Sequence, residues 1–446
     1  MKSAFLLMLG LAVCVAPCGA QTPAVDGLDP RPPCTKNAPL APLTVVDAVD
    51  LALCRHPQTQ EVWAQARVQA AQLGIASAAW WPRLDGRATL QQREQDGSRS
   101  EARTAELALS WLLYDGGVRA ANEDSARHLL QAALGTRDAT LQTVILAAVR
   151  AYFTAQASSA AVEAARLAEK AAARSLDVAE ARYRAGVATP ADRLQAQTAW
   201  SQATLSRIRA EGEAANARGA LAHALGFPAQ VPLSLAPAPA LPAAERFTRD
   251  VERLIDDALR QRPDLKALSA QVEAAEASLR AARAQRQPSL TLGAGPLWQS
   301  LAGREIMGGS LGVTLSLPIF TGYEQTWRIR QAEAQREVRE AQRARLAQQV
   351  ALDVWQAWHS LRTATQALSA SRDLLASAEQ SARVALGRYQ AGVGTVLDLL
   401  TAQAAEAGAR QQRIQTELEW NVYRAMLAQA LGSLDGSLLQ EGEEMR

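Results

Sequence analysis

The chain has 446 residues, 48% of them hydrophobic, and its formal net charge is only +2. So small a net charge excludes strong electrostatic attraction to nucleic acid or to an acidic partner. Length alone favours two or three domains, while the abundance of alanine, glutamine, arginine, leucine and glutamate over long stretches is typical of long helices and coiled coils.

The first twenty residues have the pattern of an export signal. Lys2 provides the positive start, the apolar stretch 4–15 is too short to cross a membrane as a helix, and Cys18 begins a small-residue cleavage site. We therefore expect residues 1–20 to be removed as a signal peptide. The alternative is attachment of a lipid to a cysteine, which Pro17 before Cys18 disfavours.

The mature chain then keeps two cysteines, Cys34 and Cys54. Export brings them into an oxidising compartment, where disulfides form and persist. A bridge between them would join the proline-rich segment 21–43 to the first helix and contribute on the order of 3 kcal/mol in the chain-entropy model. We expect this bridge; the alternative is two unpaired thiols.

The rest of the chain is a duplicated unit. Landmark residues recur at a constant offset, as Pro57 and Pro263 do (263 − 57 = 206). Further pairs at this offset are Pro82 and Pro288, Gly116 and Gly322, Tyr183 and Tyr389, Asp192 and Asp398, and Gly226 and Gly432. Such regular spacing indicates an internal repeat. The expected divisions are a first repeat at 44–227, a Pro/Ala linker at 228–250, a second repeat at 251–432 and a tail at 433–446.

Each repeat is predicted to begin with a helix. Thr44 can cap the first one, with Asp47 three residues further on. Pro57 predicts a kink or a break within this helix, which ends before Pro82.

Two strands are expected next, because apolar residues alternate there with small or polar ones. The alternating apolar positions are Leu107, Leu109 and Trp111 in the first repeat, and Leu290, Leu292, Ala294, Leu311, Val313, Leu315 and Leu317 in the second. The polar segment 95–104 is expected to form an exposed hairpin tip. Gly308 and Ser310 are expected to be hairpin-turn residues.

A very long helix is predicted after the strands, at 118–184 and again at 325–390, because neither stretch contains proline. At 1.5 Å per residue such a helix is roughly 100 Å long, more than a globular domain needs. The second copy carries a heptad pattern, which predicts a left-handed coiled coil. Its positions are Val354, Leu361, Leu368, Leu375, Ala382 and Tyr389, with Ala357, Ala364, Ser371, Ala378 and Ala385 on the neighbouring seam.

A turn and a returning helix complete each repeat. Gly186 and Gly392 can adopt the left-handed conformation that ends a helix. Thr189 can then cap the next helix, with Pro190 at its first position, and that helix runs to about Leu225.

Four strands in two hairpins are too few to close a barrel, and unpaired strand edges are forbidden in lipid. If the strands lie in a membrane, they must therefore close with other copies of the chain: three copies would supply twelve strands and two copies eight. Aromatic residues crowd the strand ends, as in the girdles of outer-membrane barrels. They are Trp80, Trp81, Trp111, Tyr114, Trp298, Phe320, Tyr323 and Trp327. The alternative is a small soluble sheet that caps a coiled coil.

Several motifs resemble those of a known family. They are Leu43-Thr44 through Ala48-x-x-x-Ala52-Leu53-x-x-x-Pro57, Trp81-Pro82-Arg83-Leu84, Leu317-Pro318-Ile319-Phe320-Thr321-Gly322, and Arg388-Tyr389-x-Ala391-Gly392-Val393-x-Thr395-x-x-Asp398-x-Leu400. Together they resemble the TolC-type outer-membrane factors (the outer membrane efflux protein family). Segment 51–59, with Cys34 upstream, looks most like the CyaE-like branch, which serves type I protein secretion.

The resemblance implies a mainly α fold with a transmembrane β part in the bacterial outer membrane. Each chain would add four strands to a twelve-stranded barrel of a homotrimer, and its helices would build a long periplasmic coiled-coil barrel. The implied partners are a periplasmic membrane-fusion adaptor, an inner-membrane transporter of the ABC type or another type, and outer-membrane lipid. Neither a cofactor nor nucleic acid is implied.

By resemblance, the helical tips close the periplasmic mouth and receive the adaptor. The gate candidates are Tyr183, Asp192, Tyr389 and Asp398, and the candidate adaptor contacts are Arg182, Ala185, Gly186, Val187, Arg388, Ala391, Gly392 and Val393. Three copies of Asp398 around an axis would attract cations. The two aspartates also fit helix caps, and the two roles can coexist.

The chain departs from the family pattern at two positions of the second tip. Gly394 stands where a gate-locking arginine is found, and Thr401 stands where a second acidic residue is found. The resemblance therefore implies a looser gate and a weaker cation site here.

The sequence offers little for catalysis. The four histidines lack the spacing of a zinc motif, and no Gly-x-x-x-x-Gly-Lys phosphate loop is present. The stretch 308–312 matches Gly-x-Ser-x-Gly, but a nucleophile elbow needs a strand–turn–helix setting, whereas this motif opens an expected membrane strand. We expect neither an enzyme nor a bound metal.

The first hypothesis for function is therefore an outer-membrane export channel, driven by partners, that secretes a toxin-like protein. Export of small molecules or drugs is the alternative within the same class. A structural periplasmic coiled-coil protein is the alternative of another class.

Overall fold

The computed structural model describes residues 42–95, 98–237, 251–301 and 304–434. The predicted signal peptide and Cys34 lie outside these ranges, as do most of the predicted tail and part of the predicted linker.

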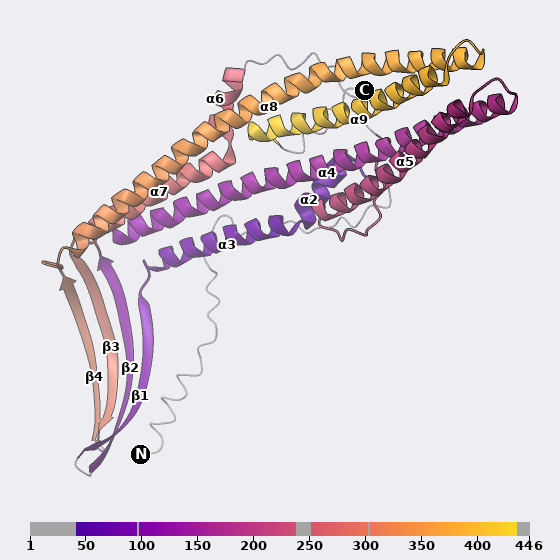
Figure 1. The fold of residues 1–446 in the computed structure, drawn as a ribbon. Helices are drawn as coiled ribbons and strands as arrows, with labels where there is room; N and C mark the ends of the chain where they lie inside the picture. Colours follow the sequence, from indigo (N-terminus) through magenta and orange to yellow (C-terminus); the bar gives the residue numbers. More distant parts are fainter. Residues whose placement is uncertain (1–41, 96–97, 238–250, 302–303, 435–446) are drawn as a thin grey trace. The chain divides into compact units, whose positions relative to one another are not determined.

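The same order of elements occurs twice along the chain (Figure 1). The first repeat contains α2 (Val45–Arg55), α3 (Pro57–Ala78), β1 (Arg83–Gln95), β2 (Ser98–Tyr114), α4 (Val118–Arg184) and α5 (Pro190–Ala224). The second contains α6 (Val251–Gln261), α7 (Pro263–Ala284), β3 (Ser289–Leu301), β4 (Arg304–Ser316), α8 (Glu324–Gln390) and α9 (Val396–Ala430). Each helix of the second repeat begins 206 residues after its counterpart, as α6 does after α2 (251 − 45 = 206). The offset seen in the sequence thus extends to the secondary structure.

The start of the first repeat shows how local sequence sets the helix bounds. The backbone N–H of Asp47 donates to the Thr44 hydroxyl at 3.2 Å, and a carboxylate oxygen of Asp47 accepts from the Thr44 N–H at 3.4 Å, so the predicted cap is confirmed. Pro57 produces a break, because the residue before a proline is held out of the helical conformation. His56 is accordingly extended (φ −62°, ψ 130°), and α3 begins at Pro57 itself.

The long helices have the predicted extent. α4 and α8 each contain 67 residues, and α8 begins one residue earlier than expected, at Glu324. The heptad positions of α8 are buried, from Val354 (0% exposed) to Tyr389 (3%), which confirms the predicted seam. None of the helices in the described ranges combines the length and the hydropathy that crossing a membrane requires.

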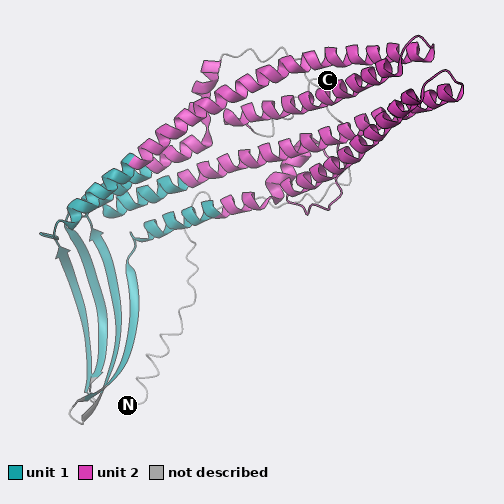
Figure 2. Ribbon diagram, viewed as in Figure 1, with its two compact units in different colours: residues 1–31, 65–131, 273–337 teal, residues 32–64, 132–272, 338–446 magenta. Residues whose placement is uncertain are grey.

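The chain forms two compact units (Figure 2). Of the described residues, unit 1 contains 65–131 and 273–337, and therefore holds all four strands and the helix ends next to them. Unit 2 contains the remaining described residues, all helical or in connections apart from an isolated bridge between Leu43 and Leu235. One of its hydrophobic cores includes Tyr152 and Leu221, and another includes Trp420.

The sheet of unit 1 is antiparallel, in the order β1–β2–β3–β4. The central pair, β2 with β3, joins the two repeats within one sheet. Residues paired across strands share a face, and one row runs Leu84, Leu109, Ala294 and Leu311. That face is apolar, as the alternation in the sequence predicts, while β1 and β4 remain edge strands.

Two sequence expectations about the strands are wrong. Most of segment 95–104 is strand and not loop, since β1 continues to Gln95 and β2 starts at Ser98. Gly308 and Ser310 are not turn residues; they pair with Leu297 and Gly295 inside β4. In both places the backbone ladder extends beyond the apolar alternation, because hairpin pairing requires main-chain groups and not apolar side chains.

Candidate functional site

The candidate site consists of the two helical tips in unit 2. At the first tip α4 turns into α5, and at the second α8 turns into α9 (Figure 1). Gly186 and Gly392 have φ of 75° and 78°, conformations that glycine adopts without steric strain. The N–H of Val393 donates to the carbonyl of Arg388 at 3.0 Å, and the N–H of Gly392 to that of Tyr389 at 3.1 Å. These bonds form a Schellman motif, which ends the helix and satisfies its last carbonyls.

Each returning helix begins with a capping box. The N–H of Asp192 donates to the Thr189 hydroxyl at 3.2 Å, and the N–H of Asp398 donates to the Thr395 hydroxyl at 3.1 Å. In return, the two aspartates accept hydrogen bonds from the threonine N–H groups. The helix-capping role expected for both gate aspartates is therefore confirmed.

The two tips share a small hydrophobic core. Its buried members are Ala179 on α4, Ala196 on α5, Tyr389 on α8, and Val396 and Leu399 on α9. Each hairpin thus covers apolar side chains of the other, and opening the pair would expose them to water.

Arg182 of the first tip binds Tyr389 of the second. One guanidinium nitrogen donates to the Tyr389 carbonyl at 2.5 Å, and the guanidinium carbon lies 4.8 Å from the centre of the Tyr389 ring. The positive charge therefore sits at the carboxyl end of α8, where the helix dipole favours a cation. Sequence reasoning named both residues but did not pair them, because no local pattern shows which residues of the two repeats meet.

The buried Tyr389 ring has an unusual electrostatic setting. Burial raises the pKa of its hydroxyl, the charge of Arg182 opposes that rise, and the charge of Asp192 adds to it. No hydrogen-bond partner for this hydroxyl is found within the described residues. Tyr389 is thus held as a neutral side chain between the tips.

The remaining tip residues face outward. Tyr183 is 38% exposed, and Arg193, which sequence reasoning missed, lies 5.3 Å from the centre of its ring. Val187 and Val393 are 64% and 69% exposed. The other candidate adaptor contacts, Ala185, Gly186, Arg388, Ala391 and Gly392, are exposed as well.

Asp398 is exposed and remains charged in mild acid. Hydrogen bonds from Thr395, first from its side chain and then from its backbone, hold the pKa of the Asp398 carboxyl below its ordinary value, and the charge of Arg388 lowers it further. A site for cations requires this ionised state, and a negative charge at the start of a helix also stabilises the helix.

Gly394 occupies a position with little room for a side chain. A Cβ atom there would lie 3.2 Å from both the Cβ of Arg388 and the backbone nitrogen of Tyr389. Any larger residue would press on the end of α8. Thr401 is exposed on α9.

The sheet presents a second surface of functional interest, opposite its apolar face. In the first repeat this surface is charged, with Arg87 on β1 and Glu106 on β2 paired at 3.1 Å. In the second repeat the same surface carries small residues, including Gly293 and Gly312, which are paired across β3 and β4. The two halves of the sheet therefore differ in chemistry on this surface.

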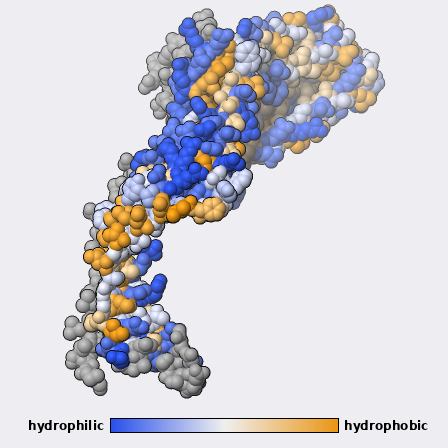
Figure 3. All heavy atoms as spheres, turned by 90° about the vertical axis from the view of Figure 1, so that its left-hand side faces the viewer, coloured by the Kyte–Doolittle hydropathy of each residue, from blue (hydrophilic) through white to orange (hydrophobic). Residues whose placement is uncertain are grey.

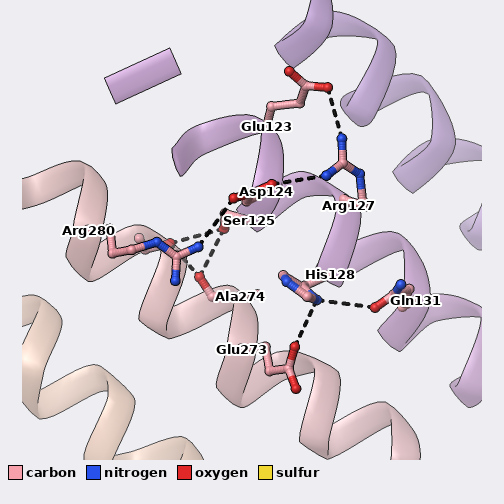
Figure 4. Close-up of polar contacts among 10 residues, drawn as sticks. Glu123, Asp124, Ser125, Arg127, His128, Gln131, Glu273, Ala274 and Arg280 are labelled. Atoms are coloured by element: carbon pink, nitrogen blue, oxygen red, sulfur yellow. Dashed lines mark hydrogen bonds and ion pairs between the residues drawn. The ribbon is translucent and has the colours of Figure 1, made fainter. Parts of the chain in front are cut away.

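A polar seam joins α4 to α7 within unit 1 (Figure 4). Asp124 accepts from Arg127 at 3.0 Å and pairs with Arg280 of α7 at 3.3 Å. His128 lies 3.3 Å from Glu273 of the same helix. These contacts cross from one repeat to the other and fix the two helices against each other.

Two features of the chain bear on the chemistry considered in the sequence. No group of three or more potential metal ligands occurs among the described residues, and Ser310 lies in the middle of a strand and not on a strand–turn–helix elbow. A cavity of about 420 Å³ in unit 2 is lined in part by Arg262, Asp264 and Asp353. Arg262 forms ion pairs with both carboxylates, at 2.7 and 2.9 Å, so each carboxylate has a cation beside it.

Cys54, near the end of α2, is disulfide-bonded. Its expected partner, Cys34, lies outside the described residues, so the pairing of these two cysteines remains a prediction.

Comparison with known families matches most of the chain. The family model described as "Outer membrane efflux protein" matches residues 48–227 and 254–433, one segment for each repeat.

Two individual relatives and one solved structure also resemble the chain over most of its length. The chain is 33% identical over 444 residues to Protein CyaE of Bordetella pertussis, covering 96% of this chain and 92% of that protein. It is 27% identical over 379 residues to the probable efflux pump outer membrane protein TtgC of Pseudomonas putida, covering 81% and 77%. The crystal structure of the CmeC outer membrane channel of Campylobacter jejuni has the same fold, with a TM-score of 0.79, 18% identity and 90% of each chain covered.

Proposed function

Since this chain belongs to the outer membrane efflux protein family and is an outer-membrane channel protein with a long periplasmic part, we propose that it exports a protein, as the outer-membrane component of a type I secretion system. The observation that carries the proposal is the extent of similarity to CyaE, 33% over 96% of the chain, against 27% over 81% for the efflux-pump protein TtgC.

The segment that most resembles the type I secretion branch, residues 51–59, is a packed corner and not a variable loop. The Arg55 guanidinium lies 4.4 Å from the centre of the Phe227 ring, and Thr59 is 1% exposed. A Cβ atom at Gly226 would lie 2.9 Å from the Arg55 backbone. The packing of this corner therefore constrains which residues can occupy it.

Three copies of the chain would complete the channel. The free edges of β1 and β4 would pair with neighbouring subunits, since strand edges cannot remain open in lipid. Three copies give twelve strands, and the tips would then alternate between first and second repeats around the axis.

This alternation assigns a partner to Arg388. Arg182 binds Tyr389 within the chain, and Arg388 and Tyr183 are their counterparts at the same offset. In an alternating ring, Arg388 would bind Tyr183 of the neighbouring subunit in the same way. Six such contacts would hold the periplasmic mouth closed, and the exposed valines of the tips would receive the periplasmic adaptor.

Asp398 is proposed to line the constriction of this mouth. Planar-bilayer conductance of the purified protein tests this, with Asp398→Asn beside the wild type and Asp192→Asn as the matched change in the first repeat. We expect discrete, cation-selective steps that lose selectivity in Asp398→Asn. Equal selectivity in the wild type and Asp398→Asn would reduce this residue to a helix cap.

The cargo class can be tested in the bacterium that carries the gene. After deletion of the gene, proteins in the medium are identified by mass spectrometry, and susceptibility to lipophilic drugs is measured in parallel. We expect one or a few proteins to disappear from the medium while drug susceptibility stays unchanged. Increased drug susceptibility with unchanged secreted proteins would instead favour the efflux function that the name of TtgC describes.

A further inference from the structure

The two junctions between strands and long helices in unit 1 differ, although the repeat places them at equivalent positions. In the first junction, Asp115 and Arg119 form a buried ion pair at 3.2 Å, and the Arg119 guanidinium lies 4.4 Å from the centre of a Trp80 ring. The residues at the equivalent positions of the second repeat are Thr321, Gln325 and Arg286. The second junction therefore lacks both the buried ion pair and the contact between arginine and tryptophan.

The second junction carries an excess of positive charge. The end of α7 and the start of α8, residues 280–287 and 324–336, contain six arginines and two glutamates, a net charge of +4. The equivalent stretches of the first repeat, 74–81 and 118–130, contain two arginines and two acidic residues, a net charge of zero. The repeat itself thus supplies a neutral reference for the charged junction.

Two of these arginines are exposed and are not neutralised by a carboxylate. Arg286 donates to the Thr326 hydroxyl at 3.0 Å, and Arg330 lies over the Trp327 ring at 4.9 Å from its centre. Among the described residues, neither guanidinium has a carboxylate within ion-pair distance, whereas Arg328 pairs with Glu324. Thr326, which Arg286 contacts, and Arg330 lie on the same face of α8, one turn apart. The charges of Arg286 and Arg330 can therefore act on one anion.

Apolar and aromatic side chains are exposed in the same junction. Ile319 and Phe320 are 90% and 75% exposed, and Trp327 is 63% exposed. Figure 3 shows apolar side chains gathered where the strands give way to the helices, with hydrophilic side chains next to them. This arrangement is that of a water–membrane interface, where aromatic rings lie at the level of the lipid headgroups.

The backbone at this junction retains strain that the first junction avoids. Tyr323 has φ of 66°, whereas its counterpart in the first repeat is Gly117, with φ of 95°. An L-residue is sterically disfavoured in this conformation, and glycine is not. The strained position places an exposed ring, 5.7 Å from that of Phe320, at the edge of the apolar surface. Strain of this kind is characteristic of functional sites.

We propose that Arg286 and Arg330, with the Thr326 hydroxyl and the Trp327 ring, bind the phosphate of an anionic phospholipid headgroup in the periplasmic leaflet of the outer membrane. The strands lie in the membrane and the long helices in the periplasm, so the junction lies at this leaflet. Arginines bind phosphate oxygens through charge-assisted hydrogen bonds, and basic residues at a bilayer surface favour anionic over zwitterionic lipids.

Native mass spectrometry of the purified mature protein in neutral detergent tests the proposal. The protein is titrated with phosphatidylglycerol and, separately, with phosphatidylcholine. We expect tighter binding of phosphatidylglycerol by the wild type and roughly 30-fold weaker binding by the double variant Arg286→Gln, Arg330→Gln, with phosphatidylcholine binding unchanged. Both substitutions replace exposed side chains, so the variant should fold, as the heat stability of the oligomer can verify.

The matched control is Arg339→Gln, Arg343→Gln, which removes the same charge from exposed positions further along α8. It should leave the binding of both lipids unchanged. An equal loss in this control, or equal affinity of the wild type for the two lipids, overturns the proposal. Binding of inorganic phosphate as tight as that of phosphatidylglycerol would also overturn it, because the site would then recognise phosphate and not lipid.

Discussion

The guanidinium of Arg182 lies 4.8 Å from the centre of the Tyr389 ring and donates to the carbonyl of the same residue at 2.5 Å. Arg182 belongs to the first repeat and Tyr389 to the second, so this contact joins the tips of the two hairpins of one chain. The equivalent contact, of Arg388 in the second repeat with Tyr183 in the first, does not form within the chain. The Arg193 guanidinium lies over the Tyr183 ring instead. The duplication has thus produced tips with the same sequence motif and different partners.

Loss of Arg182 should loosen the closed tips. Arg182→Gln removes a charged hydrogen bond and a cation–π contact, which together are worth about 2–4 kcal/mol. We expect more frequent or larger openings in planar-bilayer recordings. Arg184→Gln is the matched control, because Arg184 ends the same helix but pairs with Glu180 of its own helix, at 3.3 Å. Identical recordings from the two variants would show that the Arg182 contact does not hold the tips together.

Features with a local or periodic cause could be predicted from the sequence. The bounds of α4 follow from the turn glycine and the lack of proline, and the buried seam of α8 follows from its heptads. Capping boxes at Thr189 and Thr395 need only residues three apart. These features depend on short-range chemistry that the sequence displays directly.

Features that depend on contacts between distant residues could not be predicted. The pairing of Arg182 with Tyr389 spans 207 residues, and no periodicity shows which tips meet. Likewise, the inner part of β4 has glycine and serine where apolar alternation is expected, because its ladder with β3 is made by the backbone. The buried pair of Asp115 and Arg119 was missed because the sequence does not show that both side chains are enclosed.

Replacing only one residue of the Asp115–Arg119 ion pair should lower the free energy of unfolding strongly. Replacing both residues should lower it much less. The two side chains are only 10% and 7% exposed, so Arg119→Gln would leave the buried Asp115 carboxylate without its counter-charge and destabilise the protein by about 3–5 kcal/mol. The double variant Asp115→Thr, Arg119→Gln copies residues 321 and 325 of the second repeat and should recover most of that loss. Thermal unfolding in detergent measures both effects. A double variant no more stable than the single one would show that the first junction needs the charge pair itself.

Cys54 should be linked to Cys34. Peptide mapping of the unreduced mature protein should detect one peptide pair that contains these cysteines and separates on reduction. Cys34→Ser should leave Cys54 open to alkylation and lower the stability by about 3 kcal/mol, the value for a loop of this length in the chain-entropy model. Alkylation of both cysteines in the unreduced wild type would contradict the pairing.

Acid should destabilise unit 2 through His56. Burial lowers the pKa of the His56 imidazole below its ordinary value of 6.5, and the nearby His223 lowers it further. The folded state therefore binds the proton more weakly than the unfolded state, so the stability contribution is fully present above pH 6.5 and is lost as the pH falls below it. Protonation would also remove the acceptor of the hydrogen bond from the Gln58 N–H to the Nδ1 atom, at 3.3 Å.

The test is the midpoint of thermal unfolding in detergent, measured from about pH 7.5 to about pH 5, where histidine titrates. His56→Gln cannot be protonated, so its midpoint should fall less than that of the wild type over this range. His223→Gln should retain most of the fall, because burial is the larger cause of the lowered pKa. If His223→Gln flattened the curve as much as His56→Gln, repulsion between the two rings, and not burial of His56, would govern the loss of stability in acid.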